Sequence, residues 1–187
     1  MLSQQKLNAM QQVRKEFQDI QNNPILNIGA TVGLPNPTNI MEWDCSMTGP
    51  QDTPFAGGLF FLRIKFPDNY PEKPPEVSFI TPIYHLNVNH KVPQNIGGES
   101  LGHVCISTLN WWNNTCNIRQ VLTDIFALFY LSNPESPYGL DRADEFRKNE
   151  KLYNAKCQFF TQKYASSNIS SQKQIYTQDW DFTFPQM

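Results

Sequence analysis

Apolar residues near the start of the chain recur three or four positions apart. They are Leu7, Met10, Val13, Phe17 and Ile20. On an α-helix this spacing gathers the side chains on one face and leaves polar residues on the other. Proline cannot join a helix interior, so the helix should end before Pro24. The pattern therefore predicts an amphipathic N-terminal helix.

The segment between residues 25 and 80 has the shorter hydrophobic period of β-strands. We predict strands over residues 25–34, 40–47, 59–66 and 76–80. Turns that contain Asn and Pro separate several of them. Because short connections join successive strands, we expect an antiparallel meander. Cys45 lies in the second strand, where it should be a small buried hydrophobe.

The second half of the chain has a helical pattern. Asn117 suits an N-cap, and Gln120 follows three residues later, as in a capping box. Apolar residues then cover more than one face of the helix, which predicts a main core helix packed on the sheet. Residues 141–148 and 150–164 predict two C-terminal helices. The fold class is therefore α+β: an N-terminal helix, a four-stranded antiparallel meander, a main helix and C-terminal helices.

Composition and charge narrow the class of protein. A chain of 187 residues with 40% hydrophobic composition predicts one domain with a substantial core. The net charge of −2 gives no argument for nucleic acid or an anionic membrane as a partner. No apolar run approaches the ~20 residues of a membrane helix, and residues 1–6 contain no signal-peptide core. The four cysteines form no C-x-x-C pair, so we expect no disulfide framework or zinc site and a reducing cytoplasmic or nuclear location.

Candidate chemistry centres on one cysteine. Cys105 follows Gly102-His103-Val104 and precedes Ile106, and Asn87 lies on a turn upstream. A thiolate is both a good nucleophile and a good leaving group, so it can accept an acyl group from one thioester and pass it on. A side-chain amide can stabilise the oxyanion of the second step. Cys105 and Asn87 are therefore the predicted catalytic residues.

Several short motifs surround this cysteine in a fixed order. They are Gly49-Pro50-x-Asp52, Phe66-Pro67-x-x-Tyr70-Pro71, His85-Leu86-Asn87, Gly102-x-x-Cys105 and Trp112. In this order and spacing they resemble the catalytic core of the ubiquitin-conjugating enzymes, the carriers between an activating enzyme and a ligase. The resemblance extends from about residue 7 to about residue 165. It implies the α+β fold of that family.

The resemblance also implies an activity. In this family the cysteine, here Cys105, accepts ubiquitin or a ubiquitin-like modifier as a thioester and transfers it to a lysine amine, usually with a ligase. Asn87 then donates a hydrogen bond to the oxyanion, or positions the loop that does. Some members have an acidic residue near the cleft, where this chain has Ser136 beside Glu135. No cofactor or metal is implied.

Some positions depart from the family pattern. Leu86 replaces the proline of the His-Pro-Asn turn, so we expect the turn to hold Asn87 less rigidly. Gln11 and Gln12 lie where many members have basic residues, and Glu72 lies where many ubiquitin-specific members have an aromatic residue. These departures, together with Asn114 in place of a proline, fall on the usual ligase-binding surface. They predict a ligase of unusual type, or none.

Two segments extend beyond the common core. An insertion at about residues 89–101 separates Asn87 from Cys105, and it is either a tolerated loop or a gate or docking element over the site. Residues 166–187 comprise a Ser-rich linker and an aromatic tail, which folds back on the domain or docks on a larger assembly. The expected organisation is a core domain at residues 1–165 followed by this linker and tail.

Two other interpretations of the cysteine compete with the enzyme. A cysteine protease needs a histidine base, and His103 lies two residues from Cys105, but no other protease signature is present. His85 is expected to be a structural residue of its turn. The second interpretation is a catalytically weak or inactive scaffold subunit that keeps the fold. The retained cysteine favours the enzyme, whereas Leu86, the insertion and the altered ligase surface favour the scaffold.

Overall fold

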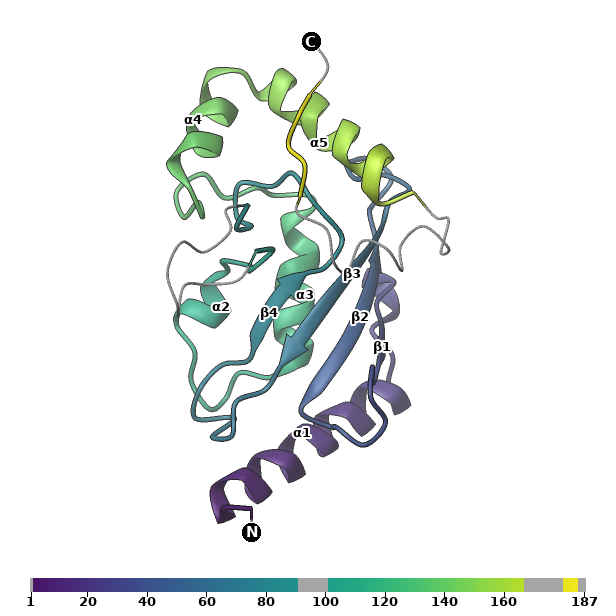
Figure 1. Ribbon diagram of the computed structural model, residues 1–187, viewed down its shortest axis with the longest axis vertical. Coiled ribbons are helices and arrows are strands. Elements are labelled where there is room, and N and C mark those ends of the chain that lie inside the picture. Colours follow the sequence, from purple (N-terminus) through teal and green to yellow (C-terminus); the bar gives the residue numbers. More distant parts are fainter. Residues whose placement is uncertain (1, 91–100, 167–179, 185–187) are drawn as a thin grey trace.

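The structure is a computed structural model that describes residues 2–90, 101–166 and 180–184. Its four strands form one antiparallel sheet in the order β1-β2-β3-β4, which confirms the predicted meander. Figure 1 shows α3 against one face of this sheet, α1 at one end of the molecule, and α4 and α5 at the other. The elements are α1 (Gln4–Asn22), the 3-10 turn η1 (Leu26–Ile28), β1 (Thr31–Gly33), β2 (Glu42–Thr48), β3 (Leu59–Lys65), β4 (Glu76–Phe79), α2 (Ser107–Asn110), α3 (Ile118–Leu128), α4 (Leu140–Lys148) and α5 (Glu150–Tyr164).

The core lies between the sheet and the helices. Strands β2 and β3 both alternate between buried and partly exposed residues, as expected for a sheet that covers a core with one face. Val121, Leu122 and Ile125 of α3 are fully buried against it. Cys45 is 1% exposed, so the prediction of a buried packing residue is confirmed. Across the described ranges, no helix combines the length and apolar character needed to cross a bilayer.

The first predicted strand is wrong in its first half. Residues Leu26–Ile28 form the 3-10 turn, and Gly29 follows with a φ of 56°. That left-handed conformation is accessible to glycine and breaks an extended strand. Only Thr31–Gly33 pair with β2. Leu26 is 83% exposed, so this apolar residue of the predicted strand does not belong to the core.

Helix α1 follows its predicted stripe except at the N-terminal end. Ser3 caps the helix by accepting a hydrogen bond from the Lys6 amide at 3.2 Å. Val13 and Ile20 are buried, but Leu7, on the first turn of the helix, is 38% exposed. The helix ends at Asn22, in agreement with the limit set by Pro24.

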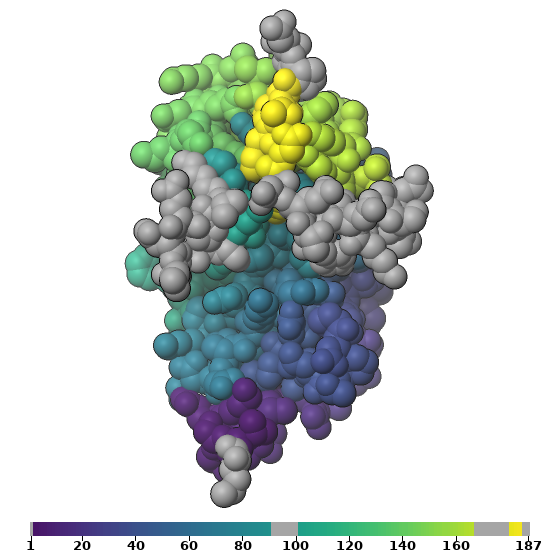
Figure 2. Space-filling model, viewed as in Figure 1, coloured from purple at the N-terminus to yellow at the C-terminus, as the bar shows by residue number. Residues whose placement is uncertain are grey.

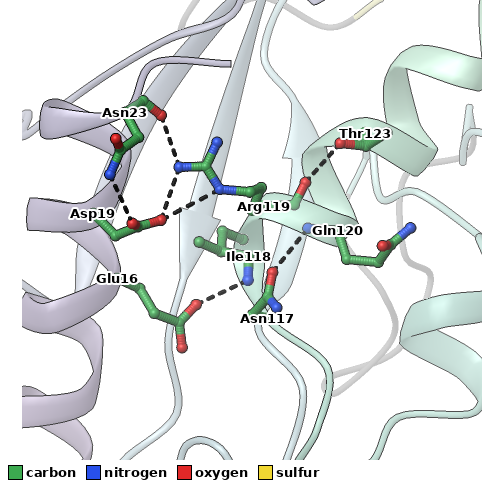
Figure 3. A network of polar contacts seen from close by, with 8 residues as sticks. All are labelled: Glu16, Asp19, Asn23, Asn117, Ile118, Arg119, Gln120 and Thr123. Atoms are coloured by element: carbon green, nitrogen blue, oxygen red, sulfur yellow. Dashed lines mark hydrogen bonds and ion pairs between the residues drawn. The ribbon is translucent and has the colours of Figure 1, made fainter.

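A polar network joins α1 to the start of α3 (Figure 3). The Glu16 carboxylate accepts a hydrogen bond from the Ile118 amide at 2.9 Å. Arg119 donates to Asp19 at 2.8 Å and to the Asn23 carbonyl at 2.7 Å. Because Glu16 pairs with an amide that has no partner inside its own helix, this contact also suits the positive end of the helix dipole.

The cap of α3 is half of a capping box. The Asn117 side chain accepts a hydrogen bond from the Gln120 amide at 3.0 Å, as predicted. The Gln120 side chain does not return to the cap; it donates to Asp124 at 2.7 Å, one turn further along the helix. The N-cap prediction is therefore confirmed, and the reciprocal bond of a capping box is replaced by an i, i+4 pair.

Candidate functional site

The two predicted catalytic residues lie on neighbouring chain segments. Cys105 donates its backbone N–H to the Asn87 carbonyl at 2.9 Å. Val88 pairs with Val104 in an antiparallel bridge. The amide and the carbonyl of Asn89 are both hydrogen-bonded to the segment that precedes Val104. This short ladder is the base of the predicted insertion. Residues 91–100, most of that insertion, lie outside the described residues.

The segment before Cys105 is docked on the edge strand β4. The Gly102 carbonyl accepts from the Phe79 amide at 2.8 Å, and the Val104 amide donates to the Val77 carbonyl at 3.0 Å. Gly102 has a φ of 82°, and a Cβ at this position would lie 2.1 Å from the Phe79 carbonyl oxygen. No other residue fits this close approach. The Gly-x-x-Cys spacing therefore fixes where the sheet presents the cysteine.

The Cys105 thiol is partly exposed at a pocket. Asn110 Nδ2 donates to Cys105 Sγ at 3.3 Å, and Ser136 Oγ lies 3.9 Å from the same sulfur. The pocket has a volume of about 490 Å³ and extends over the C-terminal half of α3 to the loop at residues 131–136. The thiol is thus on the wall of a pocket, where another molecule can reach it. Sequence reasoning missed Asn110, whose only signal was its place five residues after the cysteine.

Asn87 is a buried polar residue whose side chain holds the loop beyond α3. Its Nδ2 donates to the Asn133 carbonyl at 3.0 Å and to the Ser136 carbonyl at 2.7 Å, and its Oδ1 accepts from the Asn133 amide at 2.8 Å. The side chain is 1% exposed. Both amide protons are thus engaged with the loop that carries Ser136 beside the thiol. Asn87 fixes the distance between that loop and Cys105.

His85 is the structural residue of the turn, as predicted. Its Nδ1 accepts a hydrogen bond from the Asn87 amide at 3.0 Å, and its Nε2 lies 3.1 Å from the Leu128 carbonyl. An accepting Nδ1 places the proton of a neutral ring on Nε2, which can then donate to Leu128. Burial lowers the pKa of His85 to about 4. The ring is therefore neutral at pH 7 and faces the protein interior, not the thiol.

Both backbone groups of Leu86 are hydrogen-bonded to distant residues. Its amide donates to the Tyr153 hydroxyl at 2.8 Å, and its carbonyl accepts from the Tyr138 amide at 2.7 Å. The side chain is 1% exposed. A proline could not make the first of these bonds because it has no N–H. The leucine lacks the fixed φ of a proline but makes a hydrogen bond to α5, and the looser hold on Asn87 stays a prediction.

The histidine required by the protease interpretation is not beside the thiol. His103 contacts the Tyr138 ring with a centroid distance of 6.2 Å and lines a different pocket, near Lys65 and Lys73. The polar side chains at Cys105 Sγ are an amide and a hydroxyl, neither of which is a general base at neutral pH. This arrangement does not form the thiol–imidazole pair of a cysteine protease.

The side chains of the two residues at the predicted acidic position point in different directions. Ser136 points toward Cys105, whereas the Glu135 side chain is 85% exposed and lies 3.5 Å from Arg147. The carboxylate therefore belongs to an ion pair with α4 and does not line the pocket at the thiol. At this position the chain presents a hydroxyl to the cysteine.

The Pro-rich loop that carries Glu72 contacts two other parts of the chain. Gln5 of α1 donates to Glu72 at 3.2 Å, which joins the first helix to this loop. Trp112 packs on the same loop: its Nε1 donates to the Pro71 carbonyl at 2.7 Å. The neighbouring Trp111 is 82% exposed. Of the altered positions on the predicted ligase surface, Glu72 is thus held to α1 by a polar contact.

Comparison with known protein families agrees with this fold. The sequence model described as "Ubiquitin-conjugating enzyme" matches residues 12–161, which is most of the chain. The chain belongs to the ubiquitin-conjugating enzyme family, and the predicted resemblance is confirmed. At the general level the family comprises transferases that carry ubiquitin or a ubiquitin-like protein between activating enzymes and ligases. The match ends before residues 166–187.

Proposed function

We propose that this chain is an active ubiquitin-conjugating transferase that carries ubiquitin or a ubiquitin-like modifier on Cys105. The single observation that supports this most is the accessible Cys105 thiol at the mouth of a pocket, with Asn110 donating to its sulfur at 3.3 Å. A donor aimed at sulfur stabilises a thiolate more than a thiol. The same contact assists the cysteine both as a nucleophile and as a leaving group.

The first step loads the cysteine. The Cys105 thiolate attacks the carbonyl carbon of the thioester that joins the modifier to the activating enzyme. A new C–S bond forms to Cys105, the C–S bond to the activating enzyme breaks, and the released thiolate takes up a proton equivalent to the one that Cys105 lost. The two thioesters are similar in energy, so the step needs no cofactor and no strong base.

The second step transfers the acyl group to a lysine amine. The amine attacks the carbonyl carbon, an oxyanion forms, and its collapse expels the Cys105 thiolate as the amine loses its proton to water. Asn87 acts by holding residues 133–136, because its amide protons are already bonded to carbonyls of that loop. The loop then orients Ser136 at the reacting carbon. Usual partners are an activating enzyme and a ligase, here of unusual type because of Glu72, Gln11, Gln12 and Asn114.

The alternative is a scaffold subunit of a larger assembly that keeps the fold without the transfer. The altered ligase surface favours it, because a charged Glu72 bonded to Gln5 does not present an apolar contact to a ligase. The two functions differ in one observable property. The enzyme forms a thioester on Cys105, and the scaffold does not.

Thioester trapping tests the proposal. The protein is incubated with ATP and with ubiquitin or a ubiquitin-like modifier, each with its own activating enzyme, and is analysed on a non-reducing gel. We expect one modifier to give a shifted band that thiol reductant removes and that Cys105→Ala lacks. Cys116→Ala is the matched control, because Cys116 is also partly exposed, and it should keep the band. A folded protein that gives no band with any modifier would establish the scaffold instead.

A further inference from the structure

Residues 180–184 fold back onto the domain. The backbone carbonyl of Asp181 accepts from the Tyr164 hydroxyl at 3.0 Å, and its carboxylate pairs with Lys163 at 2.8 Å. Phe182 stacks on Phe160 of α5, with centroids 5.0 Å apart and ring planes 14° apart. Figure 2 shows this segment, in yellow, seated between the helices of the C-terminal half. Of the two alternatives for the tail, this described part is folded on the domain.

Arg142 is a buried cation under this segment. It is 3% exposed. Its guanidinium carbon lies 4.0 Å from the centre of the Tyr84 ring and 4.5 Å from the centre of the Phe182 ring. Both distances are well inside the roughly 6 Å range of a cation–π contact. Phe182 therefore closes one side of the site in which Arg142 is buried.

The same guanidinium reaches the turn beside the predicted active site. Arg142 Nη1 donates to the His85 carbonyl at 3.3 Å, and the Val88 amide donates to that carbonyl at 3.2 Å. His85 in turn accepts from the Asn87 amide through its ring. One continuous series of contacts thus runs from Phe182 through Arg142 and His85 to Asn87.

The turn has a leucine, Leu86, in place of the family's proline, and it makes several contacts with distant residues. Its amide and carbonyl groups are bonded to residues from the last third of the chain: Leu86 to Tyr153, and the Tyr84 carbonyl to Cys157 Sγ at 3.0 Å. A proline restricts a turn from within, whereas this turn is restricted from outside by α4, α5 and the segment 180–184. Arg142 is the member of this set that joins the segment to the turn.

We propose that Arg142 is a positioning residue for the catalytic turn, and that Phe182 holds it in place. Phe182 is then a part of the active-site scaffold, through its contact with Arg142. The effect on turnover rests on the proposed function of Cys105, whereas the effect on the turn does not. Phe182 and Arg142 act through His85 and Asn87 and do not line the pocket at the thiol.

The test compares Phe182→Ala with Phe184→Ala in the full chain. Both variants remove a phenyl ring that packs on Phe160, but the Phe184 ring lies over Lys156 at 4.9 Å instead of over Arg142. The thioester is preloaded and its discharge to free lysine is followed in a single turnover. We expect Phe182→Ala to lower the maximal rate roughly tenfold, since misplaced catalytic groups are costly, with the half-saturating lysine concentration unchanged. Phe184→Ala should stay within about twofold of the parent.

A double variant assigns the effect to Arg142. Once Arg142→Met has removed the guanidinium, Phe182→Ala should slow discharge no further, because the two changes interrupt the same series of contacts. If the two losses multiply as independent effects, Phe182 does not act through Arg142 and the proposal is overturned.

Hydrogen exchange at backbone amides tests the effect on the turn separately from the effect on turnover. The amides of Asn87 and Val88 are both bonded to His85, so they report on the turn directly. We expect faster exchange at these two amides in Phe182→Ala than in Phe184→Ala, at conditions where both variants are fully folded. Equal exchange in the two variants overturns the proposal. If the parent protein forms no thioester, the proposed function fails, and the exchange result still confirms or overturns the link from Phe182 to the turn.

Discussion

The Leu86 amide donates a hydrogen bond to the Tyr153 hydroxyl at 2.8 Å, across 67 residues of sequence. Both residues are at most 1% exposed, so water cannot replace the bond. This relationship takes the place of a proline and ties the turn before Asn87 to α5. It makes the hydroxyl of one aromatic residue a determinant of the site.

Tyr153→Phe should destabilise the protein by about 1–3 kcal/mol, because it leaves the buried Leu86 amide without an acceptor. Leu86→Pro removes the donor, so Tyr153→Phe should cost less in that background. Urea unfolding of the four proteins measures the coupling as a double-mutant cycle. Strictly additive effects would show that the bond contributes nothing of its own.

Asn87→Ala should slow lysine discharge roughly 100-fold, by analogy with the loss of an oxyanion-hole group, because residues 133–136 lose the amide that holds them. Ser136→Ala is the matched variant. It removes the hydroxyl near Cys105 Sγ but keeps the carbonyl that Asn87 binds. Single-turnover discharge should show a smaller loss for Ser136→Ala. An equal loss would assign the effect to the hydroxyl instead of the loop.

Stability should depend on the protonation of His85. Burial lowers its pKa from 6.5 to about 4, so the folded state binds the proton more weakly than the unfolded chain does. The neutral imidazole therefore contributes on the order of 3 kcal/mol to the free energy of unfolding. This contribution is fully present above pH 6.5 and is lost as the pH falls toward 4. Unfolding free energies of the parent and of His85→Gln, measured from pH 7 to 4.5, should fall more steeply for the parent. Parallel curves would contradict the burial of a neutral imidazole.

Glu16→Ala should destabilise the junction of α1 and α3 by about 2–3 kcal/mol. The carboxylate accepts from the Ile118 amide, from the Tyr70 hydroxyl and from Gln12, and all three donors would lose it. Asp19→Ala is the comparison, because its ion pair with Arg119 is solvent-exposed and such pairs contribute little. Urea unfolding should rank Glu16→Ala well below Asp19→Ala in stability. The reverse order would place the strength of this junction in the ion pair.

The parts of the fold that the sequence predicts are those set by local patterns. The alternation in β2 and β3, the α1 stripe and the Asn117 cap each depend on residues within a few positions of one another, and each is present. The 3-10 turn was missed because Leu26 and Ile28 resemble strand residues, and the left-handed φ of Gly29 is not evident from an apolar run.

The parts of the site that escaped prediction depend on contacts between distant segments. Motifs predicted Cys105 and Asn87 as site residues, but Asn110 as a donor to the thiol was missed, because an asparagine five residues after the cysteine belongs to no motif. The hydrogen bond from the Leu86 amide requires Tyr153 to be adjacent in space. No local sequence pattern predicts that contact. Likewise, Asn87 contacts a loop 46 residues away.

The ladder of residues 87–89 with residues 102–105 has a practical consequence for protein engineering. Its hydrogen bonds set the separation of Asn87 and Cys105. A redesign of the site therefore has to keep the backbone pairing of these residues intact, because a change in their register would move Asn87 relative to the thiol.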